Sequence, residues 1–173
     1  MDIAKDELHR IEFGPPSDDE PAFIVVRVFF TAENPVDVVA RAGEVLTRVV
    51  ERVPSWPPED DWPDLLPSWF VENCAPESPA DPTQDAAERL AWWQSLTPQE
   101  KAAAAQGPWT LSGWLYYFDP IEGEGDDRSW WWWNAGNDEP ERGWIDVATT
   151  GWPFGTGSLY WLIEACGGTD PHY

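Results

Sequence analysis

Proline density between positions 54 and 82 most constrains how this chain can fold. Eight of its 18 prolines fall there. Proline interrupts helices and cannot donate a hydrogen bond within a sheet, so long helices and central strands are excluded from this stretch. Trp56, Trp62 and Trp69 lie in it, and a disordered linker does not carry such apolar bulk. We therefore predict an ordered, irregular, proline-rich segment over residues 54–82, with a short helical turn near 64–72.

The chain before this segment has two regular elements. Residues 1–21 are polar and predict an irregular lead-in. Residues 22–31 form an apolar run whose two alternating faces are both largely hydrophobic, which predicts a strand covered on both sides. Asn34 and Pro35 then suit the start of a helix, and apolar residues recur at three- and four-residue steps up to position 53.

The chain after it changes from helical to strand-like patterns. Helices are predicted over 83–95 and from the capping box at 97–100 up to Gly107. Alternating patterns predict strands at 109–118, 128–135 and 143–149, and a helix follows at 159–166.

The element order is therefore β-α, an irregular and helical middle, then β-β-β-α. We predict one α+β domain over residues 1–173, with an antiparallel-containing sheet of about four strands. The helices are expected on one face of the sheet, and the proline- and tryptophan-rich segment over part of the other.

The net charge of the chain limits the classes of molecule that the protein is expected to bind. Thirty-two acids against ten bases give a net charge of −22. Such a field repels nucleic acid and anionic lipid and speeds encounter with a basic partner. The apolar runs are too short to cross a bilayer, and the first residues lack an apolar leader. We expect no nucleic-acid or membrane binding and a cytoplasmic protein whose two cysteines, Cys74 and Cys166, are reduced thiols.

The sequence contains little that indicates catalysis. The chain has no nucleophile elbow, phosphate-binding loop or zinc-protease motif, and its two histidines stand near the two ends. Glycines 155 and 157 precede a predicted helix, where a helix cap is a better interpretation than an anion site. Asp119, Asp138 and Asp146 keep a carboxylate-based hydrolase as a remote alternative. We predict a non-catalytic protein with no cofactor and no metal.

The chain has fourteen tryptophans, which can be buried in the core or can form a binding surface. Residues 130–133 are four consecutive tryptophans, and in a strand they alternate between the two faces. One hypothesis places one pair beneath the helices and the other beneath the proline-rich segment. The alternative exposes an aromatic platform, with Trp131 and Trp133 as binding residues, for a carbohydrate or a cationic metabolite.

The favoured binding surface is predicted in a stretch of the chain without lysine or arginine. No lysine or arginine stands between Arg52 and Arg89, whereas nine acids do. Acids around aromatic anchors suit a basic protein partner, because charge steers the encounter and the rings supply buried area. In size and acidity the chain resembles a small acidic inhibitor, such as an immunity protein or antitoxin. The oligomeric state stays open. The predicted binding residues of this stretch are Trp56, Glu59, Asp60, Asp61, Trp62, Asp64 and Trp69.

Overall fold

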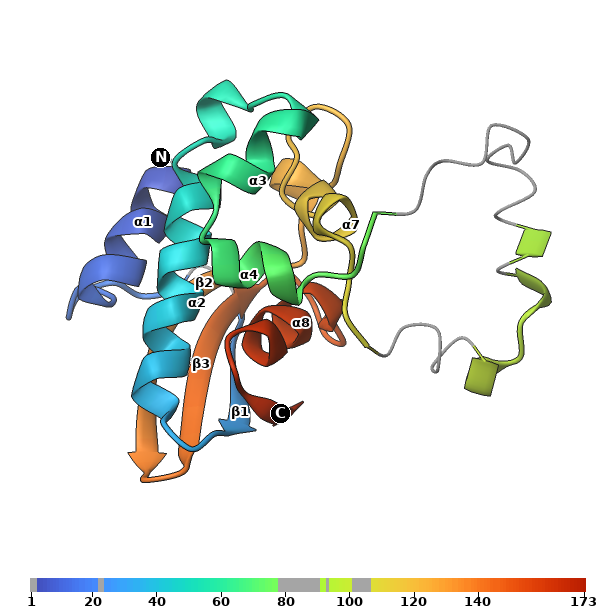
Figure 1. Ribbon diagram of the computed structural model, residues 1–173. Helices are drawn as coiled ribbons and strands as arrows, with labels where there is room; N and C mark the ends of the chain where they lie inside the picture. The colour runs from blue at the N-terminus through green and yellow to red at the C-terminus, as the bar shows by residue number, and fades with distance from the viewer. Residues whose placement is uncertain (1–2, 22–23, 78–90, 93, 101–106) are drawn as a thin grey trace.

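The fold is built on one antiparallel sheet. The computed structural model describes residues 3–21, 24–77, 91–92, 94–100 and 107–173. The sheet has four strands in the order β2-β3-β1-β4 (Figure 1). The α+β prediction with about four strands is confirmed. The strands are β1 (Ile24–Thr31), β2 (Trp130–Glu139), β3 (Arg142–Thr149) and β4 (Thr169–His172).

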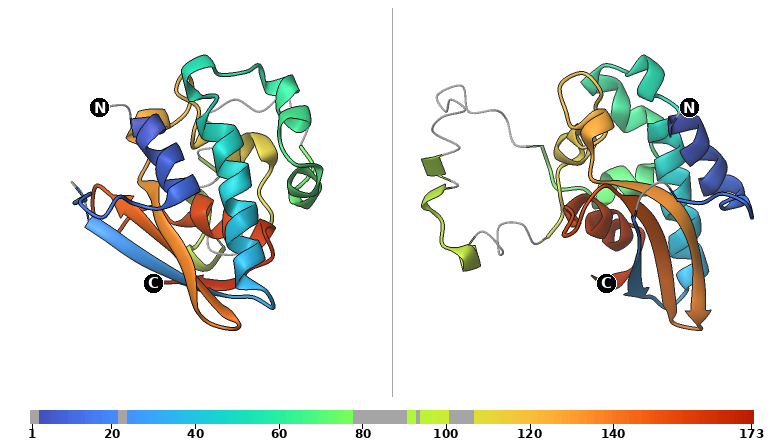
Figure 2. Two further views of the ribbon diagram at one scale, coloured as in Figure 1. Left: turned by 90° about the vertical axis from the view of Figure 1, so that its left-hand side faces the viewer. Right: turned by 180° about the vertical axis from the view of Figure 1, so that it is seen from behind.

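Helices cover one face of this sheet. The two longest, α1 (Ile3–Phe13) and α2 (Pro35–Val50), lie side by side (Figure 2), and α2 packs across β2 and β3. Buried valines and Leu46 of α2 belong to the same hydrophobic core as Val28 and Ile145, which are paired across β1 and β3 and are fully buried. Further helices with described bounds are α7 (Leu111–Tyr116) and α8 (Gly157–Ala165) and the short α3 (Trp62–Leu65), α4 (Ser68–Asn73), η1 (Val53–Ser55), η2 (Glu59–Asp61) and η3 (Gly125–Asp127).

The described part of the proline-rich segment, residues 54–77, lies on the helical side of the sheet, and its predicted place over the opposite face is wrong. Arg48 of α2 donates to the carbonyl of Leu65 at 3.3 Å, and the Phe70 ring lies 5.0 Å from that of Trp114 in α7. Figure 2 shows that this part of the chain lies on the same side of the sheet as the helices. The opposite face of β1 is consequently partly open, with Arg27 exposed.

The predicted strand at 109–118 is also wrong, since this stretch contains the helix α7. Thr110 caps it, and its hydroxyl accepts a hydrogen bond from the Gly113 amide at 3.1 Å. Leu111, Trp114, Leu115 and Phe118 are buried at helical spacing. The same residues satisfy both an alternating and a helical pattern, and packing decides between them. The fourth strand comes instead from the C-terminal β4.

The N-terminal lead-in is helical over α1, contrary to the prediction of an irregular segment. Its Glu7 is fully buried, pairs with Arg128 and accepts the Trp132 amide at 2.8 Å. A tertiary ion pair thus holds a helix whose own sequence carries a weak apolar stripe.

Only part of the predicted helical middle can be compared. Most of the helix predicted at 83–95 lies outside the described residues. The capping box after it is confirmed. The Thr97 amide donates to Glu100 at 2.7 Å, and the Glu100 amide donates to the Thr97 hydroxyl at 3.2 Å.

The first three tryptophans of the run alternate as predicted. Trp130 and Trp132 lie beneath the helices, 0% and 2% exposed. Trp131, opposite Ala148 of β3, points to the other face and is buried. Trp133 lies at a register shift of the strand, and the Arg10 guanidinium of α1 lies 4.4 Å from its ring centre. The second pair is therefore not covered by the proline-rich segment.

Candidate binding groove

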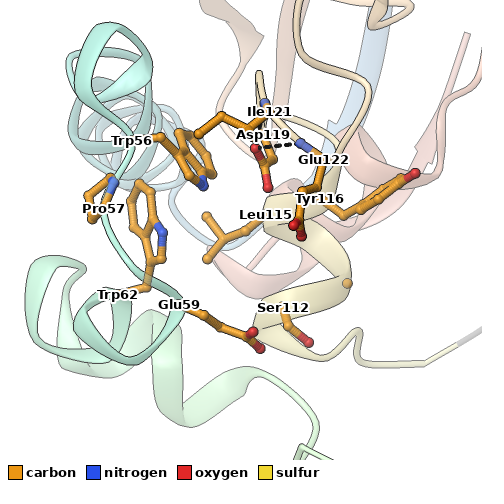
Figure 3. Close-up of a pocket in the computed structure, with 11 residues that line it drawn as sticks. Trp56, Pro57, Glu59, Trp62, Ser112, Leu115, Tyr116, Asp119, Ile121 and Glu122 are labelled. Carbon is orange, nitrogen blue, oxygen red and sulfur yellow. Dashed lines mark hydrogen bonds between the residues drawn. The ribbon is translucent and has the colours of Figure 1, made fainter.

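A groove separates the proline-rich segment from α7 and the loop that follows it. It consists of two cavities, of about 560 and 350 Å³, which share Glu59, Trp62, Ser112 and Leu115. Figure 3 shows the larger of the two. We call the larger one the upper cavity and the other the lower cavity. The groove brings together two stretches that lie far apart in the sequence.

Aromatic and aliphatic side chains form the walls of the upper cavity. The Trp56 ring packs on that of Trp62 with centroids 4.6 Å apart, and Trp62 is only 1% exposed. Trp62 therefore fixes Trp56 from behind. On the α7 side, Tyr116 and Ile121 are exposed at 53% and 76%. Exposed apolar side chains beside a cavity are typical of a surface that buries area on binding.

Within the described part of the chain, five carboxylates line the two cavities, and no lysine or arginine lines either of them. One of the five, Glu77, accepts the amide and the hydroxyl of Ser112 at 2.9 and 2.6 Å, so it ties the proline-rich segment to α7. Carboxylates without bases give this groove a negative potential. The five are Glu59, Asp60, Glu77, Asp119 and Glu122.

Asp119 is held by its own loop. Its Oδ1 accepts the amides of Ile121 and Glu122 at 2.8 and 3.2 Å, whereas its second oxygen points into the upper cavity (Figure 3). The loop folds tightly onto α7, because a Cβ on Gly123 would lie 1.8 Å from the Tyr116 carbonyl oxygen. Only glycine permits this approach. Asp119 thus presents one fixed acceptor oxygen to the groove.

The predicted binding residues divide into three groups. Trp56, Glu59, Asp60 and Trp62 line the groove, although Trp62 is buried behind its wall. Asp61, Asp64 and Trp69 lie elsewhere on the segment: the two acids are exposed, and Arg41 lies 5.4 Å from the Trp69 ring. Trp131 and Trp133 belong to β2 and do not line the groove.

Sequence reasoning did not identify the second side of the groove. Tyr116, Asp119, Ile121 and Glu122 belong to α7 and its loop. The sequence predicts a strand at the first of these residues and names Asp119 only as a candidate acid–base carboxylate. Two signals point to the observed structure: the helical spacing from Leu111 to Phe118, and the Asp119-Pro120 pair, which favours a turn.

Two tryptophans of the sheet are covered by arginines. Arg27 lies 3.7 Å from the Trp144 ring centre, and Arg10 lies 4.4 Å from that of Trp133. A sugar ring or cationic metabolite that stacks on either ring would have to displace these guanidinium groups.

The candidate acid–base carboxylates also have structural partners. Asp146 accepts two hydrogen bonds from Arg27, at 2.7 and 2.9 Å. Arg142 beside Asp138 holds the pKa of that carboxyl below its usual range. Both aspartates therefore act as ion-pair partners on the sheet, and Asp119 closes a turn.

Two other sequence features have structural explanations. Ser158 accepts the Trp130 indole N–H at 2.9 Å within the core, at the start of α8. Both cysteines are free thiols, and burial raises the pKa of Cys74 to about 11 and that of Cys166 to about 12.

Neither a metal site nor a membrane-spanning helix is found in the described part of the chain, nor is a related protein found. Within the described residues, no cluster of three or more histidine, cysteine or acidic side chains is arranged to hold a metal ion. Among those same residues, no helix has the length and hydropathy needed to cross a bilayer. No family model matches the chain, and neither a curated protein nor a solved structure matches it.

Proposed function

We propose that this chain is a non-catalytic acidic protein that binds a basic protein partner through the groove. It would act as an immunity protein or antitoxin does, by occupying a basic cleft of its partner. The observation that carries this proposal is the composition of the groove: five carboxylates around an aromatic wall, with no lysine or arginine among its described lining residues.

Charge and burial have separate roles in this proposal. The net charge of −22 raises the rate of encounter with a basic surface and orients it. Trp56, Tyr116 and Ile121 then supply apolar area that a partner can cover. Aromatic anchors of this kind contribute most of the free energy in protein interfaces.

Partner isolation from the native host tests the proposal. The immobilised protein is expected to retain a basic protein at low salt, and the purified partner should rebind with one-to-one stoichiometry by calorimetry. Its affinity should fall steeply as ionic strength rises, because surface charges are screened beyond about 8 Å at physiological salt.

Two results would count against the proposal. One is retention of no basic protein at low salt. The other is a purified partner whose affinity is the same at low and high salt. Binding of a small amine in the upper cavity, without any protein partner, would instead support a small-ligand protein.

A further inference from the structure

One arrangement occurs three times around the sheet. In each case an arginine guanidinium lies over an aromatic ring and also pairs with an aspartate. The distances from guanidinium to ring centre are 4.4, 3.7 and 4.6 Å. The three triads are Arg10–Trp133–Asp19, Arg27–Trp144–Asp146 and Arg142–Phe29–Asp138.

The upper cavity contains two members of such a triad. Trp56 supplies the ring, and Asp119 supplies the carboxylate, whose second oxygen points into the cavity (Figure 3). Among the residues that the structure describes, no arginine or lysine lines this cavity. The chain has thus brought an aromatic ring and a fixed carboxylate together without the guanidinium that completes the arrangement elsewhere.

We propose that the upper cavity receives an arginine side chain of the basic partner, an inference that rests on the proposed function. Its guanidinium would lie against Trp56 and donate to the free oxygen of Asp119. Further N–H groups would reach Glu59 or Glu122 on the rim. Leu115, on the floor, would contact the aliphatic stem.

Arginine fits this cavity better than lysine for two physical reasons. A guanidinium is planar and weakly hydrated, so it stacks on an aromatic ring at a small desolvation penalty. It also presents several N–H donors in fixed directions, which can serve Asp119 and a second carboxylate together. A lysine ammonium is a compact, strongly hydrated charge that gains less from the ring.

Two labelled peptides of equal length and charge test this inference by fluorescence anisotropy. One is an oligolysine, and the other has a single arginine in place of its central lysine. We expect the arginine peptide to bind about fivefold more tightly at low salt, given the usual strength of such stacking.

Asp119→Asn is the decisive variant. Asparagine keeps the Oδ1 acceptor for the loop amides, so the turn survives while the oxygen in the cavity becomes an N–H donor. It should weaken the arginine peptide about tenfold and abolish the preference over lysine. Asp18→Asn, an exposed aspartate outside the groove, is the matched control and should change both affinities by less than about twofold.

The outcomes separate the inference from the proposed function. Equal binding of the two peptides, or equal effects of the two variants, would overturn the arginine pocket while leaving a basic partner possible. Failure of both peptides to bind at low salt would contradict the acidic groove itself. Trp56→Leu should also abolish the arginine preference, and a retained preference in that variant would overturn the stacking geometry.

Discussion

Replacing Glu7 with alanine is expected to lower the free energy of unfolding by about 3–5 kcal/mol, because it leaves a buried charge without its partner. Glu7 is fully buried and Arg128, which pairs with it, is 6% exposed. Glu7 also accepts the Trp132 amide. One Nη of Arg128 has no hydrogen-bond partner even in the intact protein. Loss of the carboxylate would thus isolate the arginine and free α1 from β2.

Urea denaturation followed by circular dichroism measures this effect. Glu12→Ala is the control, since Glu12 is an exposed acid on the same helix and should change stability by less than about 0.5 kcal/mol. Similar losses in the two variants would show that the Glu7–Arg128 pair does not hold α1 in place.

The second large effect is expected from Trp62→Ala. This side chain is 1% exposed, lies in the main hydrophobic core and supports Trp56 from behind. Truncating a buried tryptophan removes about 3–5 kcal/mol of stability. It should also loosen the proline-rich segment, so peptide affinity for the groove should fall in the fraction of protein that stays folded.

Trp56→Leu separates the two roles. Trp56 is half-buried, so its replacement should reduce stability by about 1 kcal/mol while still impairing binding. Denaturation and anisotropy measured on both variants distinguish support from contact. Equal losses of stability would show that Trp62 is no more important to the core than Trp56.

Local patterns predicted the elements in which one periodicity dominates. The strand β1 and the helix α2 emerge from apolar residues at period two and at helical spacing, respectively. The capping box at Thr97 and Glu100 could also be predicted from the local sequence, because its two hydrogen bonds join residues that are three positions apart. In these cases the information lies within one element.

Other elements depend on contacts that are distant in the sequence. The helix α1 is held by a pair whose members stand 121 residues apart, which no local window reveals. The sequence around α7 fits two periods, and burial of Trp114 against Phe70 settles it as a helix. Tertiary packing therefore overrides the local pattern at both places.

The groove likewise has one side that the local sequence predicts and another that depends on contacts distant in the sequence. Its proline-rich side was predicted from the loss of bases and the interleaved tryptophans, and four of those residues line it. Its other side, with Tyr116 and Asp119, could not be paired with the first without knowing that α7 packs beneath the segment. The position of Asp119 depends further on the close approach at Gly123.

A matched-charge comparison tests the groove most directly. The triple variant Glu59→Gln, Asp60→Asn, Glu122→Gln removes three charges from the groove. The control Asp18→Asn, Glu20→Gln, Glu51→Gln removes three exposed charges elsewhere. Binding of the purified basic partner should weaken about tenfold or more in the groove variant and less than about threefold in the control. Equal weakening in both would show that the partner responds to net charge alone, and would contradict the groove as the binding site.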